Sequence, residues 1–295
     1  MDESSVFLNG LFGLHGRVAI VSGSTGGLGQ AIALALFQAG AKVVINGRTQ
    51  TRAVLSREEI YLKTSRNSGL LAMEGDMSSP TDAKHVVDQT ITEFGRIDII
   101  VNNAGVNLPE MPFEASTLED WEHLSAANII GPINLSKAAL PYLKQSSAGR
   151  IINVSSIASH VGMPCNTLYS MTKAAMLLFT KSLSVELQQM RFLHLNSTTT
   201  TNTVNATSHA PNGFHHNHSH NQITVNSISP GVFATPMNAK FELGTAARAE
   251  ILRHIPMGRL GEAHELVGIV VYLASSASAY TTGADFLVDG GYCAV

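Results

Sequence analysis

Charged residues are scarce in this 295-residue chain. They make up 14% of it, where about 25% is usual for soluble domains, so more of the surface is left for contacts between subunits. The 19 lysine and arginine residues are balanced by 22 aspartate and glutamate residues, which gives a formal charge of −3. This balance provides no positive field for a phosphate backbone, so we expect no nucleic-acid partner.

Long apolar runs and a set of paired cysteines are also missing. No run approaches the roughly 18 apolar residues of a membrane-spanning helix, so we expect no membrane partner. The first residues, Met-Asp-Glu-Ser-Ser, lack the basic and then apolar layout of a signal peptide. Two cysteines, Cys165 and Cys293, cannot build a disulfide framework. We therefore expect a cytoplasmic protein in a reducing compartment.

The chain does contain a regular alternation of short apolar runs and segments with helical spacing. The first run is continuous rather than alternating, which indicates a strand buried on both faces. Strands are predicted at residues 17–22, 42–46, 70–74, 97–102, 150–154, 224–227 and 284–288. Helical segments are predicted at residues 27–39, 51–66, 80–94, 117–127, 128–144, 167–189, 236–254 and 262–274. This order predicts an α/β fold, a doubly wound parallel sheet of about seven strands with helices on both faces.

One segment interrupts the alternation. Residues 190–221 contain few aliphatic residues and show no period, so they cannot bury enough surface to offset the entropy of ordering. We therefore expect one domain over residues 11–295 with a disordered insertion at 190–221, after an N-terminal tail of residues 1–10. The insertion and its start hold six histidines, but their spacing matches no closed ligand set, so we expect no metal site. They are His194, His209, His215, His216, His218 and His220.

A glycine-rich turn directly follows the first predicted strand. It reads Ser22-Gly-Ser-Thr-Gly-Gly-Leu-Gly29 and leads into the first helix. Gly23 permits a tight turn, Gly27 lets the backbone approach a pyrophosphate, and Gly29 lets the helix pack against the strand. The helix N-terminus would then face the phosphates of a dinucleotide. The spacing differs from the usual Gly-x-Gly-x-x-Gly pattern.

The end of the second strand bears on the choice of cofactor. Folds that prefer NAD place a carboxylate here to bind the ribose hydroxyls. This chain has Asn46-Gly47-Arg48 instead, and an arginine can bind a 2′-phosphate with its planar fork. The sequence therefore favours NADP(H), although NAD(H) stays possible and Arg48 could be an ordinary exposed cation.

Tyr169 and Lys173 lie four residues apart at the start of the long predicted helix, so they share one face of it. An ammonium beside a phenol favours the phenolate and would lower the pKa of Tyr169 from about 10. A tyrosine tuned in this way can exchange a proton with a carbonyl oxygen.

Several motifs together resemble the short-chain dehydrogenase/reductase family. They are the glycine pattern, Asn102-Asn-Ala-Gly105, Ser156 thirteen residues before Tyr169, Lys173, Pro230-Gly231 and Asp289-Gly290-Gly291. The resemblance covers residues 11–295 apart from the insertion and implies a Rossmann-like fold. Its segments toward the C-terminus are similar to gluconate 5-dehydrogenases, sugar-alcohol dehydrogenases and 3-oxoacyl-carrier-protein reductases.

The resemblance implies a role for each matching residue. Tyr169 would be the general acid/base, Lys173 would lower its pKa and hold the nicotinamide ribose, and Ser156 would stabilise the substrate oxygen. Asn128 would bend a helix and hold a relay water beside the lysine. The implied cofactor contacts, in addition to Tyr169 and Lys173, are Gly23, Ser24, Thr25, Gly27, Leu28, Gly29, Arg48, Asp76, Met77, Asn103, Ala104, Gly105, Pro230, Gly231, Val232 and Thr235.

These residues predict an NADP(H)-dependent oxidoreductase that interconverts a ketone and a secondary alcohol. The substrate would be a small molecule, a sugar acid or polyol in the first reading, with 3-oxoacyl-carrier-protein reductase or another carbonyl reductase as the alternative. A regulator that binds NADP without catalysis is the remaining alternative. His160 and Cys165 precede Tyr169 and could touch substrate or merely fill space. By resemblance, the apolar helix at 174–187 would pack against a second subunit in a homotetramer or homodimer.

Overall fold

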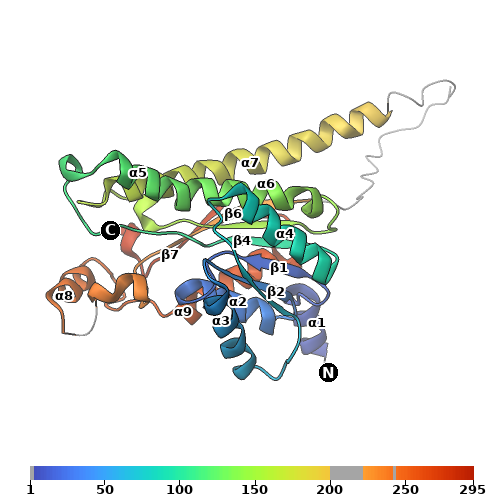
Figure 1. Ribbon diagram of the computed structural model, residues 1–295, viewed down its shortest axis with the longest axis horizontal. Coiled ribbons are helices and arrows are strands. Elements are labelled where there is room, and N and C mark those ends of the chain that lie inside the picture. The colour runs from blue at the N-terminus through green and yellow to red at the C-terminus, as the bar shows by residue number, and fades with distance from the viewer. Residues whose placement is uncertain (1–2, 200–221, 242–243) are drawn as a thin grey trace.

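A seven-stranded parallel sheet forms the centre of the molecule (Figure 1). The computed structural model describes residues 3–199, 222–241 and 244–295, with only the backbone at 190–199. The strands are β1 (Val18–Val21), β2 (Lys42–Gly47), β3 (Leu70–Glu74), β4 (Ile99–Asn102), β5 (Arg150–Val154), β6 (Thr224–Pro230) and β7 (Asp285–Val288). Their order is β3-β2-β1-β4-β5-β6-β7, and all neighbouring pairs are parallel. The predicted fold class is confirmed.

Helices cover both faces of the sheet (Figure 1). One layer contains α2 (Gly27–Gln38), α3 (Gln50–Leu62) and α9 (Ala263–Ala274), and the other contains α4 (Pro80–Phe94), α6 (Gly131–Leu143) and α7 (Thr167–Thr199). The remaining α-helices are α1 (Glu3–Phe12), α5 (Leu118–Ser125) and α8 (Ala246–Arg253). Short 3-10 turns are η1 (Phe113–Ala115), η3 (Ile157–Ser159), η4 (Pro236–Phe241), η5 (Ser276–Ser278) and η6 (Tyr292–Ala294), and η2 (Ala126–Ile130) is a π-turn.

Two apolar cores lie on the two faces of the sheet, because neighbouring residues of a strand point in opposite directions. Ala19 and Val21 of β1 pack with α2 and α9, whereas Ile20 packs with α4 and α6. All three side chains are fully buried. The continuous apolar runs of the sequence therefore reflect strands that are covered on both sides.

The strand order determines where the site lies. From β1 the chain proceeds to β2 and β3 on one side, and it then returns to β4 on the other side of β1. In open sheets of this kind, ligands bind beyond the carboxyl ends of the strands where the order reverses. The groups that follow β1, β2, β4, β5 and β6 are therefore expected to surround one groove.

Three parts of the chain differ from the sequence prediction. The expected N-terminal tail contains α1, which lies beside η5 and has no buried residue. The helix that was predicted to end at residue 189 continues to Thr199, ten residues into the expected insertion. The rest of that segment, residues 200–221, lies outside the described residues, as do five of the six histidines.

No described helix, the 33-residue α7 included, is long and apolar enough to cross a membrane.

Candidate active site

The glycine-rich turn between β1 and α2 forms a cradle of bare backbone. Gly23 and Gly27 have φ values of +63° and +54°, a region that favours glycine. A Cβ atom on Gly23 would lie 2.8 Å from the Cα of Ala104, and one on Gly29 would lie 2.4 Å from the Nδ2 of Asn103. The turn thus leaves the N-terminal amides of α2 uncovered by side chains, which fits the pyrophosphate of a dinucleotide.

Two asparagines hold this cradle in place. Asn103 donates through its Nδ2 to the carbonyl oxygens of Ser22 (2.9 Å) and Gly23 (3.2 Å). Asn46 accepts from the Gly23 amide at 3.3 Å and donates to the Gly75 oxygen at 3.1 Å. Asn103 was expected to contact the cofactor, and no role was expected for the Asn46 side chain. Here both side chains position the loop.

Ser24 is fully buried. Its hydroxyl donates to the Val21 oxygen at 2.7 Å and accepts from the Asn46 amide at 2.9 Å. The Ser24 side chain thus faces inward and bonds backbone groups, and the expected cofactor contact of this residue stays a prediction. Leu28 is partly buried and packs against the core.

The carboxyl end of β2 leaves room beside an exposed cation. A Cβ atom on Gly47 would lie 2.4 Å from the Cγ2 of Thr25, so the glycine lets these two segments come into close contact. Arg48 is exposed and forms no hydrogen bond or ion pair with any described residue. Its guanidinium is free to bind an anion at this edge of the groove.

Asp76 and Met77, expected together near the adenine, are placed differently. Asp76 is exposed, and its Oδ1 accepts from the amide and hydroxyl of Ser78 at 2.9 and 2.8 Å. Met77 is only 5% exposed and belongs to the core beneath α4 and α6. The Met77 side chain thus faces the core, and the expected contact of this residue with the adenine stays a prediction.

The segment after β6 closes the other side of the groove. Gly231 donates its amide to the Val288 oxygen at 2.9 Å, and a Cβ atom there would lie 2.7 Å from the Cα of Asp289. Val232 accepts from the Gly261 amide at 3.0 Å. Thr235 lies next to the glycine-rich turn, since a Cβ atom on Gly27 would lie 3.7 Å from the Cβ of Thr235. The structure therefore brings Pro230-Gly231-Val232 and Thr235 to the same groove as the glycines.

The four expected catalytic side chains come from three neighbouring elements. Ser156 follows β5, Tyr169 and Lys173 lie on the first turns of α7, and Asn128 is in the π-turn. The side chains of Tyr169 and Ser156 are in hydrogen-bond contact. Lys173 Nζ donates to the Val154 oxygen at 3.0 Å and lies 5.7 Å from the centroid of the Tyr169 ring. The predicted set is brought together around one point.

Asn128 is 1% exposed and ties two parts of the site to each other. Its Oδ1 accepts from the Val106 amide at 2.8 Å, and its Nδ2 donates to the Val106 oxygen (2.9 Å) and the Thr172 hydroxyl (3.0 Å). The widened turn has a local cause, because Pro132 has no N–H with which to bond the Asn128 carbonyl. A Cβ atom on Gly105 would lie 3.0 Å from Asn128 Oδ1 and 3.3 Å from Lys173 Nζ, so both groups converge on that glycine.

Burial shifts the pKa values of both reacting groups on α7. It raises the pKa of the Tyr169 phenol above 10, and the hydrogen bond with Ser156 acts in the opposite direction. It lowers the pKa of Lys173 from 10.5 to about 8. The expectation that Lys173 lowers the pKa of Tyr169 is wrong for this arrangement, because desolvation outweighs the other effects and Lys173 Nζ is directed to a backbone carbonyl.

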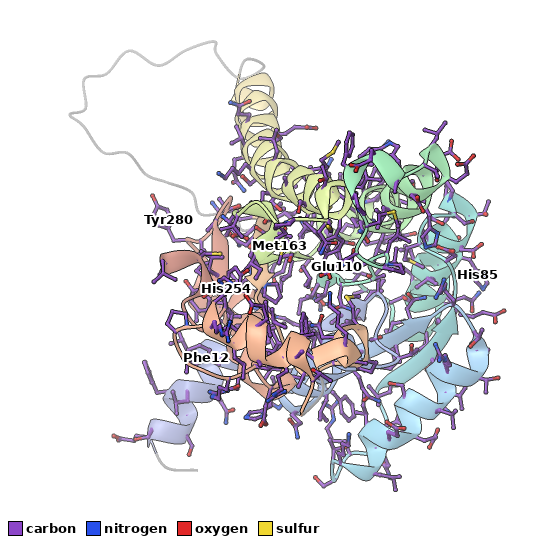
Figure 2. The ribbon with its side chains drawn as sticks, turned by 90° about the vertical axis from the view of Figure 1, so that its left-hand side faces the viewer. Phe12, His85, Glu110, Met163, His254 and Tyr280 are labelled. Carbon is purple, nitrogen blue, oxygen red and sulfur yellow. The ribbon has the colours of Figure 1, made fainter. Side chains whose placement is uncertain are left out.

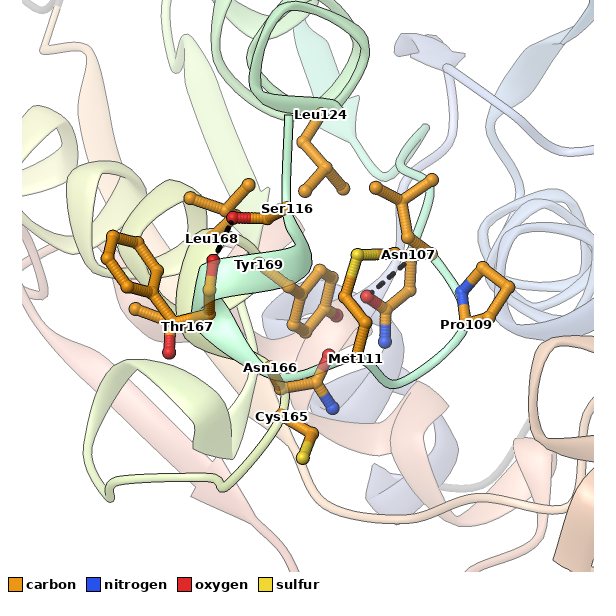
Figure 3. Close-up of a pocket in the computed structure, with 12 residues that line it drawn as sticks. Asn107, Pro109, Met111, Ser116, Leu124, Cys165, Asn166, Thr167, Leu168 and Tyr169 are labelled. Carbon is orange, nitrogen blue, oxygen red and sulfur yellow. Dashed lines mark hydrogen bonds between the residues drawn. The ribbon is translucent and has the colours of Figure 1, made fainter. Parts of the chain in front are cut away.

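A pocket of about 300 Å³, counted with its solvent-open mouth, lies beside Tyr169. Figure 3 shows the Tyr169 ring among the lining side chains, with Met111 and Asn107 beside it. Cys165 lines this pocket and is exposed, whereas His160 does not line it. Seen from the end of the molecule that holds α8, Glu110 and Met163 lie toward the middle of the view and His85 lies at its edge (Figure 2).

His160 has a role that the sequence left open. Its Nε2 lies 2.8 Å from the Oδ2 of Asp285 and 3.3 Å from the Ser229 hydroxyl. The ring therefore fastens the loop after Ser156 to β6 and β7. A histidine in a loop carries no signal that would have named Asp285, which is 125 positions away.

Among the residues that the structure describes, no group of three or more histidine, cysteine, aspartate or glutamate side chains could hold a metal ion.

The comparisons with known proteins agree with this geometry. The profile of the short chain dehydrogenase family matches residues 17–212, and one described as enoyl-(acyl carrier protein) reductase matches residues 214–293. The 2-dehydro-3-deoxy-D-gluconate 5-dehydrogenase of Escherichia coli is 33% identical over 285 residues, which cover 96% of this chain and 98% of that protein. The 3-oxoacyl-[acyl-carrier-protein] reductase of Synechocystis sp. is 31% identical over 280 residues, which cover 94% and 97%.

A solved structure gives the same result. The gluconate 5-dehydrogenase from Burkholderia cenocepacia, in complex with NADP and tartrate, has a TM-score of 0.80 and 28% identity, and the match covers 97% of this chain and 99% of that one. The family profile matches well over half of the chain, and two relatives exceed 30% identity along nearly their whole length. The chain therefore belongs to the short-chain dehydrogenase/reductase family and is an NAD(P)-linked oxidoreductase of alcohols and ketones.

Proposed function

We propose that the chain is an NADP(H)-dependent enzyme that interconverts a ketone and a secondary alcohol by direct hydride transfer. The observation that carries this proposal is the position of Tyr169, which lines the pocket, contacts Ser156 and has Lys173 one helical turn away. When bound, the nicotinamide would supply or accept the hydride. The part of the chain itself is to bind the substrate oxygen and to move a proton to or from it.

The electrostatics of the site suit proton donation near neutral pH. Because burial raises the pKa of Tyr169, its phenol stays protonated and can donate a proton to a ketone oxygen. The Ser156 hydroxyl can donate a hydrogen bond to the same oxygen and stabilise its developing charge. Lys173, with a pKa of about 8, is mostly protonated near neutrality and can donate a hydrogen bond to a bound ligand.

Replacing Tyr169 by phenylalanine tests the assignment. The variant keeps the ring but loses the proton, so we expect turnover to fall by at least about 100-fold while the affinity for NADPH changes little. Turnover is followed by the absorbance of reduced nicotinamide, and affinity by titration of its fluorescence. Near-normal turnover in this variant would contradict the assignment. Normal cofactor binding without turnover of any ketone by the native chain would favour the non-catalytic regulator.

The preference for NADP(H) is proposed from Arg48. No carboxylate follows β2 directly, and the Arg48 guanidinium is exposed and unpaired within the described chain. The Burkholderia cenocepacia relative was solved with NADP. Arg48→Ala is expected to raise the KM for NADPH about tenfold or more and to leave the KM for NADH unchanged. Arg57→Ala is the control, since it removes the same charge from α3 where Arg57 is paired with Glu58; equal effects of the two variants would refute a specific role for Arg48.

The relatives suggest two alternative substrate classes. Gluconate 5-dehydrogenases favour a sugar acid or polyol, and 3-oxoacyl-[acyl-carrier-protein] reductases favour a 3-oxoacyl thioester. A turnover screen with NADPH and NADH over sugar acids, polyols, 3-oxoacyl thioesters and neutral ketones separates the two.

We also propose that a second copy of the chain covers α7. Met171, Leu178 and Val185 are 49%, 65% and 53% exposed and follow one another at intervals of seven residues, which puts three large apolar side chains on one helix face. A homotetramer would bury this stripe, and a homodimer is the alternative. Leu178→Lys is expected to lower the mass measured by sedimentation; an unchanged mass would contradict this interface.

Both cysteines, Cys165 and Cys293, are free thiols. This agrees with the proposal of a reducing compartment such as the cytoplasm, which imaging of the tagged protein tests.

A further inference from the structure

The pocket beside Tyr169 is built almost entirely from uncharged groups. Half of its lining is apolar and comes from the β4–α5 loop, α5 and the first residues of α7. These apolar side chains are Leu108, Pro109, Met111, Phe113, Leu124 and Leu168. Its other residues are neutral side chains, apart from the titratable Tyr169 and Cys165. No lysine or arginine of the described chain lines the pocket.

Two of the polar lining groups are already occupied. The Ser116 hydroxyl donates to the Phe113 oxygen at 2.6 Å, and the Asn107 Oδ1 accepts from the Leu108 amide at 2.9 Å, as the dashed lines in Figure 3 mark. What remains for a substrate is an apolar wall with few neutral hydrogen-bond partners. Such a wall binds a hydrocarbon body and discriminates weakly among hydroxyl groups.

Lys173 lies beside Tyr169 and directs its Nζ to the Val154 oxygen. Three cations on neighbouring segments are also engaged elsewhere. Lys240 forms an ion pair with Glu110 at the exposed rim, which joins the β4–α5 loop to η4. Arg248 donates to the Phe241 oxygen at 3.0 Å, and Arg253 pairs with Glu250 at 3.0 Å. Among the side chains that line the pocket, a carboxylate would find no cation to replace its hydration, which is costly.

We infer that the physiological substrate is a neutral carbonyl compound with an apolar body, or the corresponding secondary alcohol, and not a sugar acid. This inference rests on the proposed function and adds the class of substrate to it. In the reduction, a hydride forms the new C–H bond at the carbonyl carbon, and the Tyr169 proton forms the new O–H bond as the C=O π bond breaks. The ketone gains two electrons, which the reduced nicotinamide would supply when bound, and solvent returns the proton to the phenol.

Matched substrates test this inference on the full chain with NADPH. Each set contains an oxo acid, its methyl ester and a methyl ketone of the same chain length. We expect kcat/KM for the ester and the ketone to exceed that for the acid by about 100-fold or more. Along the ketone series, kcat/KM should rise about fourfold for each added methylene that fits the pocket. An acid that is turned over as well as its ester, or better, overturns the inference and leaves the proposed function intact.

A variant pair locates the discrimination. Met111→Lys places a cation on the pocket wall and should raise the ratio of acid to ester turnover about tenfold or more. Leu62→Lys adds the same charge on α3, where Leu62 is 87% exposed, and should leave the ratio unchanged. An unchanged ratio in Met111→Lys, or the same rise in both variants, refutes the pocket as the source of selectivity. Turnover of no substrate despite measured NADPH binding would instead refute the proposed function.

Discussion

Replacing Lys173 by methionine should stabilise the protein while it abolishes turnover. Lys173 is 5% exposed, and burial lowers its pKa from 10.5 to about 8. Holding the ammonium inside the fold therefore costs about 3 kcal/mol below pH 8, at about 1.4 kcal/mol for each pKa unit. Methionine has a similar length and no charge. It also removes the 3.0 Å hydrogen bond to the Val154 oxygen, worth about 1 kcal/mol, so the net gain at pH 7 is about 2 kcal/mol.

The pH dependence of this gain is its signature. Between about pH 8 and 10.5 the unfolded chain binds more protons at residue 173 than the folded chain does. The stability of the native protein therefore rises with pH relative to the variant. The gap should close near pH 10 and then reverse by up to about 1 kcal/mol, because the hydrogen bond to the Val154 oxygen remains in the native protein. Titrating groups remote from residue 173 are common to both proteins, so their contributions cancel in the difference.

Denaturant unfolding at pH 7, 8, 9 and 10, at one protein concentration, measures the difference in the free energy of unfolding. The turnover assay runs in parallel. A methionine variant that is less stable than the native protein at pH 7 would refute the reasoning. A stability gap that stays constant from pH 8 to 10 would do so as well, because a lowered lysine pKa cannot produce it.

Three further changes test other parts of the structure. Gly29→Ala puts a Cβ atom 2.4 Å from the Asn103 Nδ2 and should weaken NADPH binding more than about tenfold. Gly26→Ala is the control and should leave the affinity nearly unchanged, because a Cβ atom there would have no atom within 4 Å. Equal affinities of the two variants in a fluorescence titration would contradict the role of the glycine-rich turn in cofactor binding. Asp98→Ala should lower the free energy of unfolding by about 3 kcal/mol, because the buried carboxylate accepts hydrogen bonds from the Val18 amide, Arg96 and Ser146. Replacing the half-exposed Arg96 by alanine should cost less than about 1 kcal/mol. Denaturant unfolding that gives the reverse order would be inconsistent with this network. Asn128→Ala removes three hydrogen bonds to Val106 and Thr172. It should therefore lower the free energy of unfolding by about 2 kcal/mol and also lower kcat. Unchanged values of both would count against the positioning role of Asn128.

The sheet could be predicted from the sequence because its strands are buried on both faces. A run such as Ile99-Ile-Val-Asn102 has no alternating surface to confuse with a helix, and glycine or polar residues mark its ends. Helix boundaries were less secure. The sequence of α1 has no buried side chain and contains Gly10, so no period identifies it. The end of α7 was placed ten residues early, because polar residues continue a helix without leaving an apolar pattern.

The site was predictable to the extent that it depends on glycines and on local spacing. Gly23, Gly27 and Gly29 are needed for backbone reasons that the sequence displays, and Tyr169 and Lys173 share a helix turn. The contacts of Asn46, Ser24 and Met77 depend on how distant strands and loops meet, and no local pattern specifies that. The pKa shift of Tyr169 could not be predicted from the sequence either, because its direction depends on how deeply the fold buries the phenol.

Neutral polar side chains hold α7 against the sheet, and their neutrality matters for Lys173. Asn102 donates to Asn153 at 2.8 Å, and Asn153 donates to Thr180 on α7 at the same distance. The Ser155 hydroxyl donates to the Lys173 carbonyl at 2.9 Å. A carboxylate buried near Lys173 would attract the ammonium and raise the pKa of Lys173.

Amides and hydroxyls fix the helix without this competition, because each bond is satisfied by another neutral group. Lys173 is the only buried ammonium that the described chain contains, and its one hydrogen bond runs to the Val154 carbonyl. The remaining donors of that ammonium lie beside Gly105 and Asn128 and are available to a ligand. Neutral hydrogen bonds thus position α7, and the Lys173 ammonium stays available for the reaction.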